Sequence, residues 1–412
     1  MLIRTQTQTQ AKPASLSPSK VPFYGAWLLR HLPFKHIQHG TLTVKIGEHQ
    51  RHFTGSESGP HAELIINEPL RFIWRFSTQG ELGFAKAYAD NSIDTPCLYT
   101  LLQLGLANEQ ALSHTTQGYK WFYQRFLQQH RNNHNSLENS RENISAHYDL
   151  GNDFYQLWLD DTMSYSSALF KTQTTPLAEA QIAKYNAILH ELNLKPNQRI
   201  LEIGCGWGGF AEQAVKQGAE VTGITLSAEQ LAFAKKRLAK QGLAQKAQLS
   251  LTDYRHQEGQ FDHIVSIEMF EAVGKEYWHE YFTQLKRLLK EDGKAILQTI
   301  TIDESRAVNY QDNVDFIQAF IFPGGLLPSK AQLLQLADEH GFLVNNELCF
   351  GQDYAKTLLC WQQQFNEHSE TLLEMGYDNH FQRIWNYYFD YCRVGFETQC
   401  TDVIQLSLSH KS

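Results

Sequence analysis

The sequence predicts an α/β protein in which a small N-terminal α/β domain precedes a doubly wound, mostly parallel sheet. Three observations predict this fold class. From residue 199 onward, short apolar strands alternate with helical periodicity, a pattern typical of a parallel sheet covered by helices on both faces. Before residue 120 short strands come first and helices follow, and an almost wholly polar stretch over 128–143 separates the two patterns. A length of 412 residues with 42% hydrophobic content suits two or three domains and excludes a disordered chain.

The N-terminal part divides into a tail, a domain and a linker. We expect a disordered polar tail over residues 1–20, a domain over 21–125 and a linker over 126–144. The predicted elements of the domain are strands over 42–46 and 62–66, a turn over 55–60, and helices over 82–88 and 98–107. Together they predict a small α/β domain.

The beginning of the chain is basic. Residues 1–47 contain six Lys or Arg and no Asp or Glu, although the whole chain has a formal net charge of −8 and a pI ≈ 6.1. The acidic balance argues against a nucleic-acid binder. Within the basic stretch, residues 21–34 interleave aromatic and cationic side chains. This segment is interpreted either as a membrane-surface helix facing anionic lipid or as an ordinary helix packed on its own domain.

The chain lacks the sequence signals of membrane insertion, secretion and disulfide stabilisation. No segment approaches the ~18 consecutive apolar residues of a spanning helix, and the polar N-terminus has no apolar region of a secretory signal. The six cysteines include no C-x-x-C pair, which argues against a disulfide scaffold or a structural metal site. We therefore expect a cytoplasmic protein without a metal, whose membrane contact is peripheral and at the inner face.

Residues 145–412 form the second predicted domain. Its predicted strands are 199–203, 220–224, 247–251, 263–267 and 295–301, and its predicted helices include 228–241 and 278–289. The tail over 356–410 is aromatic-rich and mostly helical in pattern. We expect it to cap the sheet or to line a pocket.

A glycine loop follows the first strand of this domain. Gly204, Gly206 and Gly208 lie in the run EIGCGWGG, which begins at Glu202. Glycines at the carboxyl end of a strand let the backbone approach a ligand closely beside a helix N-terminus. The spacing of Gly204, Gly206 and Gly209 also satisfies the G-x-G-x-x-G pattern. The loop alone therefore leaves a dinucleotide and an adenosyl cofactor both open.

The residues around the loop favour S-adenosylmethionine over a dinucleotide. A dinucleotide fold needs an acid about 20 residues further on for the ribose, but the second strand ends in Thr225, Leu226 and Ser227. An acid lies in the loop itself, Glu202, where it can meet the α-ammonium of an amino-acid moiety. Asp253 and Tyr254 follow the third strand, placed to bind and stack on an adenine. The Rossmann-like sheet is accordingly predicted to bind S-adenosylmethionine.

The motifs along the chain resemble those of the cyclopropane-fatty-acyl-phospholipid synthase family, which includes the mycolic acid cyclopropane synthases. The matching motifs lie at 145–155, 165–167, 202–209, 223–230, 268–274, 322–329 and 353–358, with a weaker echo at 80–88. This resemblance implies a methyltransferase domain behind a small lipid-binding-type domain. It also implies methyl transfer from the sulfonium to a cis double bond of an acyl chain, followed by loss of a proton from the new methyl group to a bound bicarbonate. An alkene is a poor nucleophile, so the site must exclude water and hold donor and alkene in line.

The resemblance assigns roles residue by residue. It places the cofactor against Tyr165, Ser166, Glu202, Gly204, Cys205, Gly206, Trp207, Gly208, Thr225, Leu226, Ser227, Gln230, Asp253 and Tyr254. It places bicarbonate against Glu271, Tyr354 and the main chain of Ile300. At two further positions this chain departs from the family, with Ser167 in place of Cys and Gln298 in place of His. Since Gln cannot titrate near neutrality, methyl transfer is well supported and ring closure is the open step.

Several alternatives remain at this point. Cys392 matches a family cysteine suspected of catalysis, but the chemistry needs no thiol nucleophile, so a structural role is the other interpretation. The product is either a cyclopropane or a methyl-branched or methylene-bearing chain, and a non-catalytic lipid-binding module is a third alternative. The implied partners are membrane phospholipids with unsaturated acyl chains, the membrane surface and a second copy of the chain in a homodimer; no nucleic acid is expected.

Overall fold

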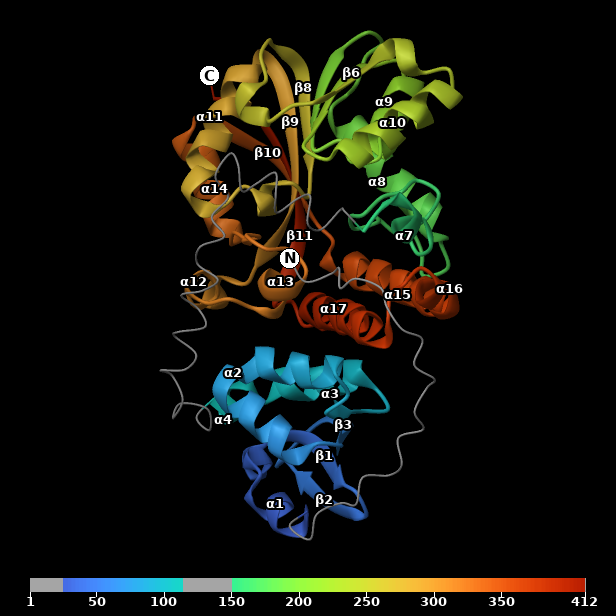
Figure 1. Ribbon diagram of the computed structural model, residues 1–412. Coiled ribbons are helices and arrows are strands. Elements are labelled where there is room, and N and C mark those ends of the chain that lie inside the picture. Colours follow the sequence, from blue (N-terminus) through green and yellow to red (C-terminus); the bar gives the residue numbers. More distant parts are fainter. Residues whose placement is uncertain (1–24, 114–149, 412) are drawn as a thin grey trace. The chain divides into compact units, whose positions relative to one another are not determined.

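The computed structural model describes residues 25–113 and 150–411, which form two compact units (Figure 1). The tail expected over 1–20, the linker expected over 126–144 and the motif residues 145–149 lie outside the described residues. Within the described ranges, no helix combines the length and the apolar character needed to cross a membrane.

The N-terminal unit contains a four-stranded sheet of order β2-β1-β3-β4. Its strands are β1 (His39–Ile46), β2 (His49–Thr54), β3 (Glu57–Ile66) and β4 (Ile93–Asp94), and its helices are α1 (Gly25–His31), α2 (Pro69–Ala89), α3 (Leu98–Ala107) and α4 (Glu109–Ser113). Alternate residues of β1 are buried, as period-two strands with one covered face require. Leu42, Val44 and Ile46 join the core of this unit.

The turn predicted over 55–60 is shorter than expected. β3 already begins at Glu57, so Gly55 and Ser56 alone separate it from β2. Pro60 is accommodated inside β3 because the register to β1 shifts between His39 and Thr41. A Cβ on Gly40 would lie 2.1 Å from the Pro60 oxygen, so the irregular pairing depends on a glycine at this close approach.

The helix at the start of the unit packs on its own domain. Leu28 and Leu29 of α1, and Leu32 and Phe34 just beyond it, are buried in the core of this unit. Trp27 is 60% exposed. The packing interpretation therefore accounts for these four buried side chains, whereas Trp27 lies on the surface.

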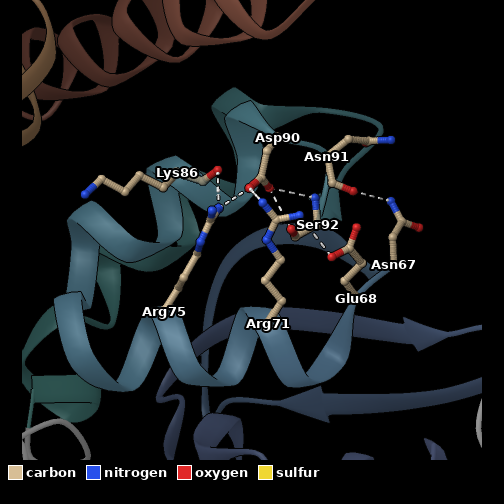
Figure 2. Close-up of polar contacts among 8 residues, drawn as sticks. All are labelled: Asn67, Glu68, Arg71, Arg75, Lys86, Asp90, Asn91 and Ser92. Carbon is tan, nitrogen blue, oxygen red and sulfur yellow. Dashed lines mark hydrogen bonds and ion pairs between the residues drawn. The ribbon is translucent and has the colours of Figure 1, made fainter. Parts of the chain in front are cut away.

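Helix α2 turns back on itself at Gly80, whose φ of 54° and ψ of −128° interrupt the helix. A Cβ on Gly83 would lie 2.2 Å from the Arg75 carbonyl oxygen, so the second half of α2 packs closely against the first. Polar contacts around Asp90 hold this arrangement (Figure 2). Arg71 and Arg75 both pair with the Asp90 carboxylate, and Ser92 donates to it through its backbone N–H and its hydroxyl.

The C-terminal unit contains a seven-stranded sheet of order β10-β11-β9-β8-β5-β6-β7. Its strands are β5 (Arg199–Ile203), β6 (Glu220–Thr225), β7 (Ala247–Leu251), β8 (Phe261–Ile267), β9 (Leu289–Ile302), β10 (Phe342–Cys349) and β11 (Thr401–His410). Strands β5 to β9 are parallel, and β11 is antiparallel to both of its neighbours. The predicted doubly wound, mostly parallel sheet is confirmed.

Two apolar layers cover the two faces of this sheet. The helices of the unit are α7 (Asn152–Gln156), α8 (Leu177–Glu191), α9 (Gly209–Lys216), α10 (Ala228–Lys240), α11 (Trp278–Leu288), α12 (Glu304–Asp312), α13 (Phe316–Phe320), α14 (Lys330–Glu339), α15 (Gly351–Glu367), α16 (Ser369–Glu374) and α17 (Asn379–Glu397). Helices α8, α9 and α10 pack on the face that contains Ile200, and helices α11 and α14 pack on the face that contains Leu201 (Figure 1). Consecutive residues of β5 thus point into opposite layers.

The expectation of a mostly helical tail is wrong for its last ten residues. Helices α15, α16 and α17 follow the prediction, but residues 401–410 form β11, which lies between β9 and β10. Six consecutive residues of β11 are buried, because a central strand is covered on both faces.

A cluster of aromatic rings joins the segment after α7 to α15 and α17. Trp158 is fully buried, and its ring lies 5.3–6.0 Å, between centroids, from six others. Those rings belong to Phe154, Tyr155, Tyr165, Trp361, Trp385 and Phe389. The cluster therefore fixes Tyr165 against two helices that are about 200 residues away in sequence, as edge-to-face ring packing permits.

Candidate active site

The glycine loop lies where the carboxyl ends of β5, β6 and β7 meet. Gly204, Gly206 and Gly208 have φ angles of 83°, 49° and 81°, which non-glycine residues rarely adopt. Around a Cβ on Gly206 no atom lies within 4 Å. The loop therefore borders open space at the position where a ligand would contact its backbone.

Glu202 provides a test of whether this space fits S-adenosylmethionine. The side chain is buried, and its Oε2 has no hydrogen-bond partner among the described residues. Burial raises the pKa of Glu202 to about 8. A buried carboxyl with an unused oxygen is suited to pair with an ammonium, so the residues present fit the amino-acid part of the cofactor.

The polar residues after β6 form a local hydrogen-bonded network. Ser227 caps α10 by accepting from the backbone N–H of Gln230 at 3.2 Å. The hydroxyl of Thr225 accepts from the N–H of Ser227 at 3.2 Å and donates to Gln230 Oε1 at 3.3 Å. The network fixes the Gln230 side chain beside the loop, where its amide nitrogen can serve a ribose or amino-acid group.

Asp253 lies at the end of β7 as expected, but it already has a strong partner. Arg255 donates to Asp253 Oδ1 through Nε at 2.9 Å and to Oδ2 through Nη2 at 2.6 Å. An adenine amine would therefore share an oxygen with this guanidinium. The neighbouring Tyr254 is buried, and its hydroxyl has no partner among the described residues.

The other residues predicted near the cofactor, Cys205, Trp207 and Leu226, are buried or half-buried in the protein. Cys205 is buried, burial raises the pKa of its thiol, and a Cβ on Gly223 would lie 3.0 Å from Cys205 Cβ. Trp207 donates from Nε1 to Asn152 Oδ1 at 2.7 Å, which ties the loop to α7. Leu226 is half-buried.

A second polar cluster lies at the carboxyl ends of β8 and β9 and centres on Glu268. Its Oε1 accepts from the Ser166 hydroxyl at 2.7 Å, the Ser167 N–H at 3.0 Å and Gln298 Nε2 at 2.7 Å. Its Oε2 accepts from the Tyr354 hydroxyl at 2.7 Å. The segment predicted to hold the cofactor and the residues predicted to hold the base thus meet on one carboxylate.

Sequence reasoning did not single out Glu268. The signal was present, because Glu268 follows β8 directly at the edge where parallel strands place functional groups. Its φ of 50° is a second indication of a functional role, and only the structure reveals it. In a non-glycine residue this conformation is strained and is concentrated at functional sites.

Sequence reasoning also missed Lys184, on α8. The side chain is fully buried, and Nζ donates to the Ser166 hydroxyl at 3.0 Å and to Gln181 Oε1 at 2.8 Å. Burial lowers the pKa of Lys184 to about 8, against the opposing effect of Glu268 and Asp160. A lysine inside an otherwise helical pattern carries no signal of burial in the sequence.

Glu271 lies close to Glu268 in a different environment. The N–H of Ile300 donates to Glu271 Oε1 at 2.5 Å, while Oε2 has no partner among the described residues. Burial and the nearby Glu268 raise the pKa of Glu271 to about 8. At neutral pH Glu271 is therefore mostly an uncharged acid, and the two carboxyl groups need not repel each other.

The residues at the two positions that depart from the family contact Glu268 in different ways. Gln298 donates to Glu268 and to Ser166 and accepts from Gln405 of β11 at 2.9 Å, so its whole amide is engaged. The hydroxyl of Ser167 donates to the Ala168 carbonyl at 3.0 Å. Only the backbone N–H of Ser167 reaches Glu268.

Aromatic side chains border the Glu268 cluster. Tyr165 donates its hydroxyl to that of Tyr388 at 3.0 Å, and its ring lies 6.0 Å from that of Phe322.

Burial, and then the nearby Asp315, raise the pKa of the Cys392 thiol. A thiol held in its neutral form is a poor nucleophile, which favours the structural interpretation of Cys392.

The residues assigned to bicarbonate do not fit a separate anion in this structure. Gln298, Tyr354 and the N–H of Ser167 already donate to the Glu268 carboxylate. A second anion would compete for these donors and repel Glu268. Among the described residues, no group of three or more His, Cys, Asp or Glu is arranged to hold a metal ion.

Comparison with known proteins identifies a family and relatives that are similar to this chain. A family profile described as "Mycolic acid cyclopropane synthetase" matches residues 135–406. The tuberculostearic acid methyltransferase UfaA1 of Mycobacterium tuberculosis is 37% identical over 274 residues, 65% of this chain and 64% of that protein. The cyclopropane-fatty-acyl-phospholipid synthase of Escherichia coli K12 is 38% identical over 265 residues, 64% of this chain and 66% of that protein. The matches thus span slightly less than two thirds of these relatives.

Solved structures of cyclopropane synthases are also similar to this chain. The mycolic acid cyclopropane synthase CmaA1, in complex with SAH and CTAB, matches with a TM-score of 0.60 and 32% identity. The match covers 65% of this chain and 97% of that one. Cyclopropane synthase MmaA2 from Mycobacterium tuberculosis matches with a TM-score of 0.59, again at 32% identity and with the same coverage.

Proposed function

This chain belongs to the mycolic acid cyclopropane synthetase family and is an S-adenosylmethionine-dependent methyltransferase, and from that premise we propose that it methylates cis double bonds in unsaturated phospholipid acyl chains. One observation carries the proposal. Tyr165 and Ser166 are predicted to hold the cofactor, and Ser166 and the adjoining Ser167 donate to the carboxylate of Glu268. The donor site and a proton acceptor are therefore adjacent.

The chain's own residues support the reaction by position and by charge. The bound cofactor supplies an electrophilic methyl group on a sulfonium. Glu202 holds its ammonium end, and the glycine loop lets the backbone approach it. The rings of Tyr165, Phe322 and Tyr388 contact one another, and their apolar and quadrupolar faces would exclude water and favour a developing positive charge.

Cofactor binding should release a proton from Glu202. With a pKa of about 8 in the free protein, this carboxyl is protonated at pH 6.5, and pairing with an ammonium favours the carboxylate. We therefore expect close to one proton released per S-adenosylmethionine bound at pH 6.5, and affinity that rises with pH toward 8. Calorimetry in buffers of different ionisation enthalpy measures this release.

Two variants test whether the released proton comes from Glu202. Glu202→Gln should abolish the release and weaken binding by about 1–3 kcal/mol. Glu271→Gln removes the other carboxyl whose pKa is about 8 and should leave the release intact. Release that persists in Glu202→Gln would place the ammonium elsewhere.

The second candidate product is a methyl-branched or methylene-bearing chain, in keeping with the name of one relative, a tuberculostearic acid methyltransferase. Ser167 and Gln298 stand where most of the family has Cys and His, which would weaken a base site built for bicarbonate. The cation formed by methyl transfer then has time to lose a proton from a neighbouring carbon. We expect branched product beside cyclopropane, and a shift toward the ring in the double variant Ser167→Cys, Gln298→His.

Mass and double-bond analysis of acyl chains from cells making each version gives the ratio. Total methyl transfer, measured as S-adenosylhomocysteine formed, serves as the internal control. Pure cyclopropane from the unmodified protein, unchanged by the double substitution, would contradict the expectation. No methylated acyl chain at all would contradict the proposed substrate.

We propose that the protein works in the cytoplasm, peripheral to the inner face of the membrane, and as a homodimer that light scattering would detect. The N-terminal unit supports membrane contact, because Trp27, Leu70 and Trp74 are each at least 60% exposed. The first 47 residues add six cations, at about 1 kcal/mol per cation near an anionic surface.

Binding to anionic phospholipid vesicles should weaken with added salt and with Trp27→Ala or Trp74→Ala. A deletion of residues 1–36 is a poorer test, because it removes four core side chains of the unit. Val308→Ala, at an exposed apolar position of the catalytic unit, is the control. Salt-insensitive binding in all variants would contradict the proposal.

A further inference from the structure

Glu268 has an unusual backbone for a side chain of its size. It follows β8, and its φ of 50° lies in the left-handed region, which is strained for a non-glycine residue. Its N–H donates to the Gln298 carbonyl at 2.8 Å, which holds this conformation against the neighbouring strand β9. The strain fixes the residue at the carboxyl edge of the sheet, half-buried beside the cofactor segment.

Four hydrogen-bond donors converge on the Glu268 carboxylate from three separate parts of the chain. They come from residues 166 and 167, from Gln298 on β9 and from Tyr354 on α15. Three donate to Oε1 and one to Oε2. An ionised carboxylate is acceptor-only, with about two acceptor sites on each oxygen. Because only Tyr354 donates to Oε2 among the described residues, that oxygen keeps room for a proton.

Three of these four donors, from Ser167, Gln298 and Tyr354, lie at positions where the family resemblance places bicarbonate. Bicarbonate and a glutamate side chain present the same planar, singly charged O–C–O group. Lys184 adds a donor behind the cluster, since its Nζ hydrogen-bonds Ser166, which in turn donates to Glu268. The pocket is built around one anionic group, and the chain itself supplies it.

Building on the proposed function, we propose that Glu268 replaces bicarbonate and is the catalytic base of this enzyme. Methyl transfer forms a carbon–carbon bond from the alkene and leaves a cation on the adjacent carbon, while the sulfonium becomes a thioether. Glu268 Oε2 then takes a proton from the new methyl group, and the electrons of that C–H bond close the ring. If the proton comes from a neighbouring chain carbon, the same electrons form a new double bond. The protonated Glu268 returns its proton to water after product release.

The neighbouring carboxyl is compatible with this role. Glu271 is uncharged at neutral pH, with a pKa of about 8, so one carboxylate and one carboxylic acid share the site. Tyr354 donates to Oε2 and is a positioning residue for the oxygen that accepts the proton.

The experiment compares the full-length protein with Glu268→Gln and Glu268→Gly on vesicles of monounsaturated phospholipid in carbon-dioxide-free buffer, with and without added bicarbonate. We expect the unmodified protein to form product at the same rate in both. Glu268→Gln keeps the shape but cannot take the proton, so product formation should fall at least about 100-fold with or without bicarbonate. Glu268→Gly vacates the pocket and suits a positive φ, so it should be slow alone and gain at least about 10-fold from bicarbonate.

Controls separate this assignment from folding and from the proposed function. Asn193→Gly makes the same kind of change at a φ of 52°, just after α8 and outside the residues that donate to Glu268, and should leave activity unchanged. S-adenosylmethionine affinity and the melting temperature should be retained in both Glu268 variants. If the unmodified protein needs bicarbonate, or if Glu268→Gln keeps its rate, the base assignment is wrong. If the unmodified protein transfers no methyl group to any acyl chain, the proposed function fails instead.

Discussion

Gly206→Val should abolish S-adenosylmethionine binding while the protein stays folded. The added side chain would enter the open space at the loop, where no atom lies within 4 Å of a Cβ on Gly206, and so would occupy the volume of the ligand. The φ of 49° also disfavours a β-branched residue. We expect affinity to fall at least about 100-fold, or about 2.7 kcal/mol, measured by calorimetry on the purified protein.

A matched glycine isolates the steric effect from backbone strain. Gly242, after α10, has a φ of 70° and likewise no atom within 4 Å of an added Cβ. Gly242→Val should lower the melting temperature about as much as Gly206→Val does, yet leave cofactor affinity unchanged. Normal affinity in Gly206→Val would show that the loop does not contact the cofactor.

Trp158→Ala should destabilise the catalytic unit by about 3–5 kcal/mol, the range for removing a large aromatic from a packed core. Trp158 is fully buried and its ring contacts six others across α7, α15 and α17. The cavity would also release Tyr165, so cofactor affinity should fall in the same variant. Urea unfolding followed by near-ultraviolet circular dichroism measures the loss of stability.

Two further variants provide reference values for the loss of stability in Trp158→Ala. Trp158→Phe keeps a ring in the cluster and should cost clearly less than Trp158→Ala. Val308→Ala, at a position 74% exposed on α12, should change the free energy of unfolding by less than about 0.5 kcal/mol. Equal destabilisation by Val308→Ala and Trp158→Ala would mean that the aromatic cluster adds little to stability.

The sequence predicted the elements whose signals are local. The bounds of β5, β7 and α3 agree with those predicted, because short apolar runs ended by glycine or polar residues mark buried strands and helix ends. β11 was missed because its alternating pattern follows a long helical region. Its place between β9 and β10 depends on pairing with residues about 100 positions earlier, which no local pattern records.

The site was predicted in part for the same reason. Motif positions predicted the glycine loop after β5 as a cofactor site and the neighbourhood of Tyr354 and Gln298 as a base site, and both assignments stay predictions. The central role of Glu268 depends on donors brought together from residues 166–167, 298 and 354. The pairing of Asp253 with Arg255 is local, yet it depends on side-chain geometry that composition and spacing do not specify.

The position of β11 has a consequence for synthesis in the cell. β9 ends at Ile302 and β11 begins at Thr401, so a ribosome adds residues 303–400 between them, which takes roughly 5–20 s at usual rates of translation. Until then β9 has an unpaired edge, the kind of surface that recruits other strands, and Gln298 lacks its partner Gln405. The nascent chain therefore carries its glycine loop long before Gln298, which donates to Glu268, gains the support of β11.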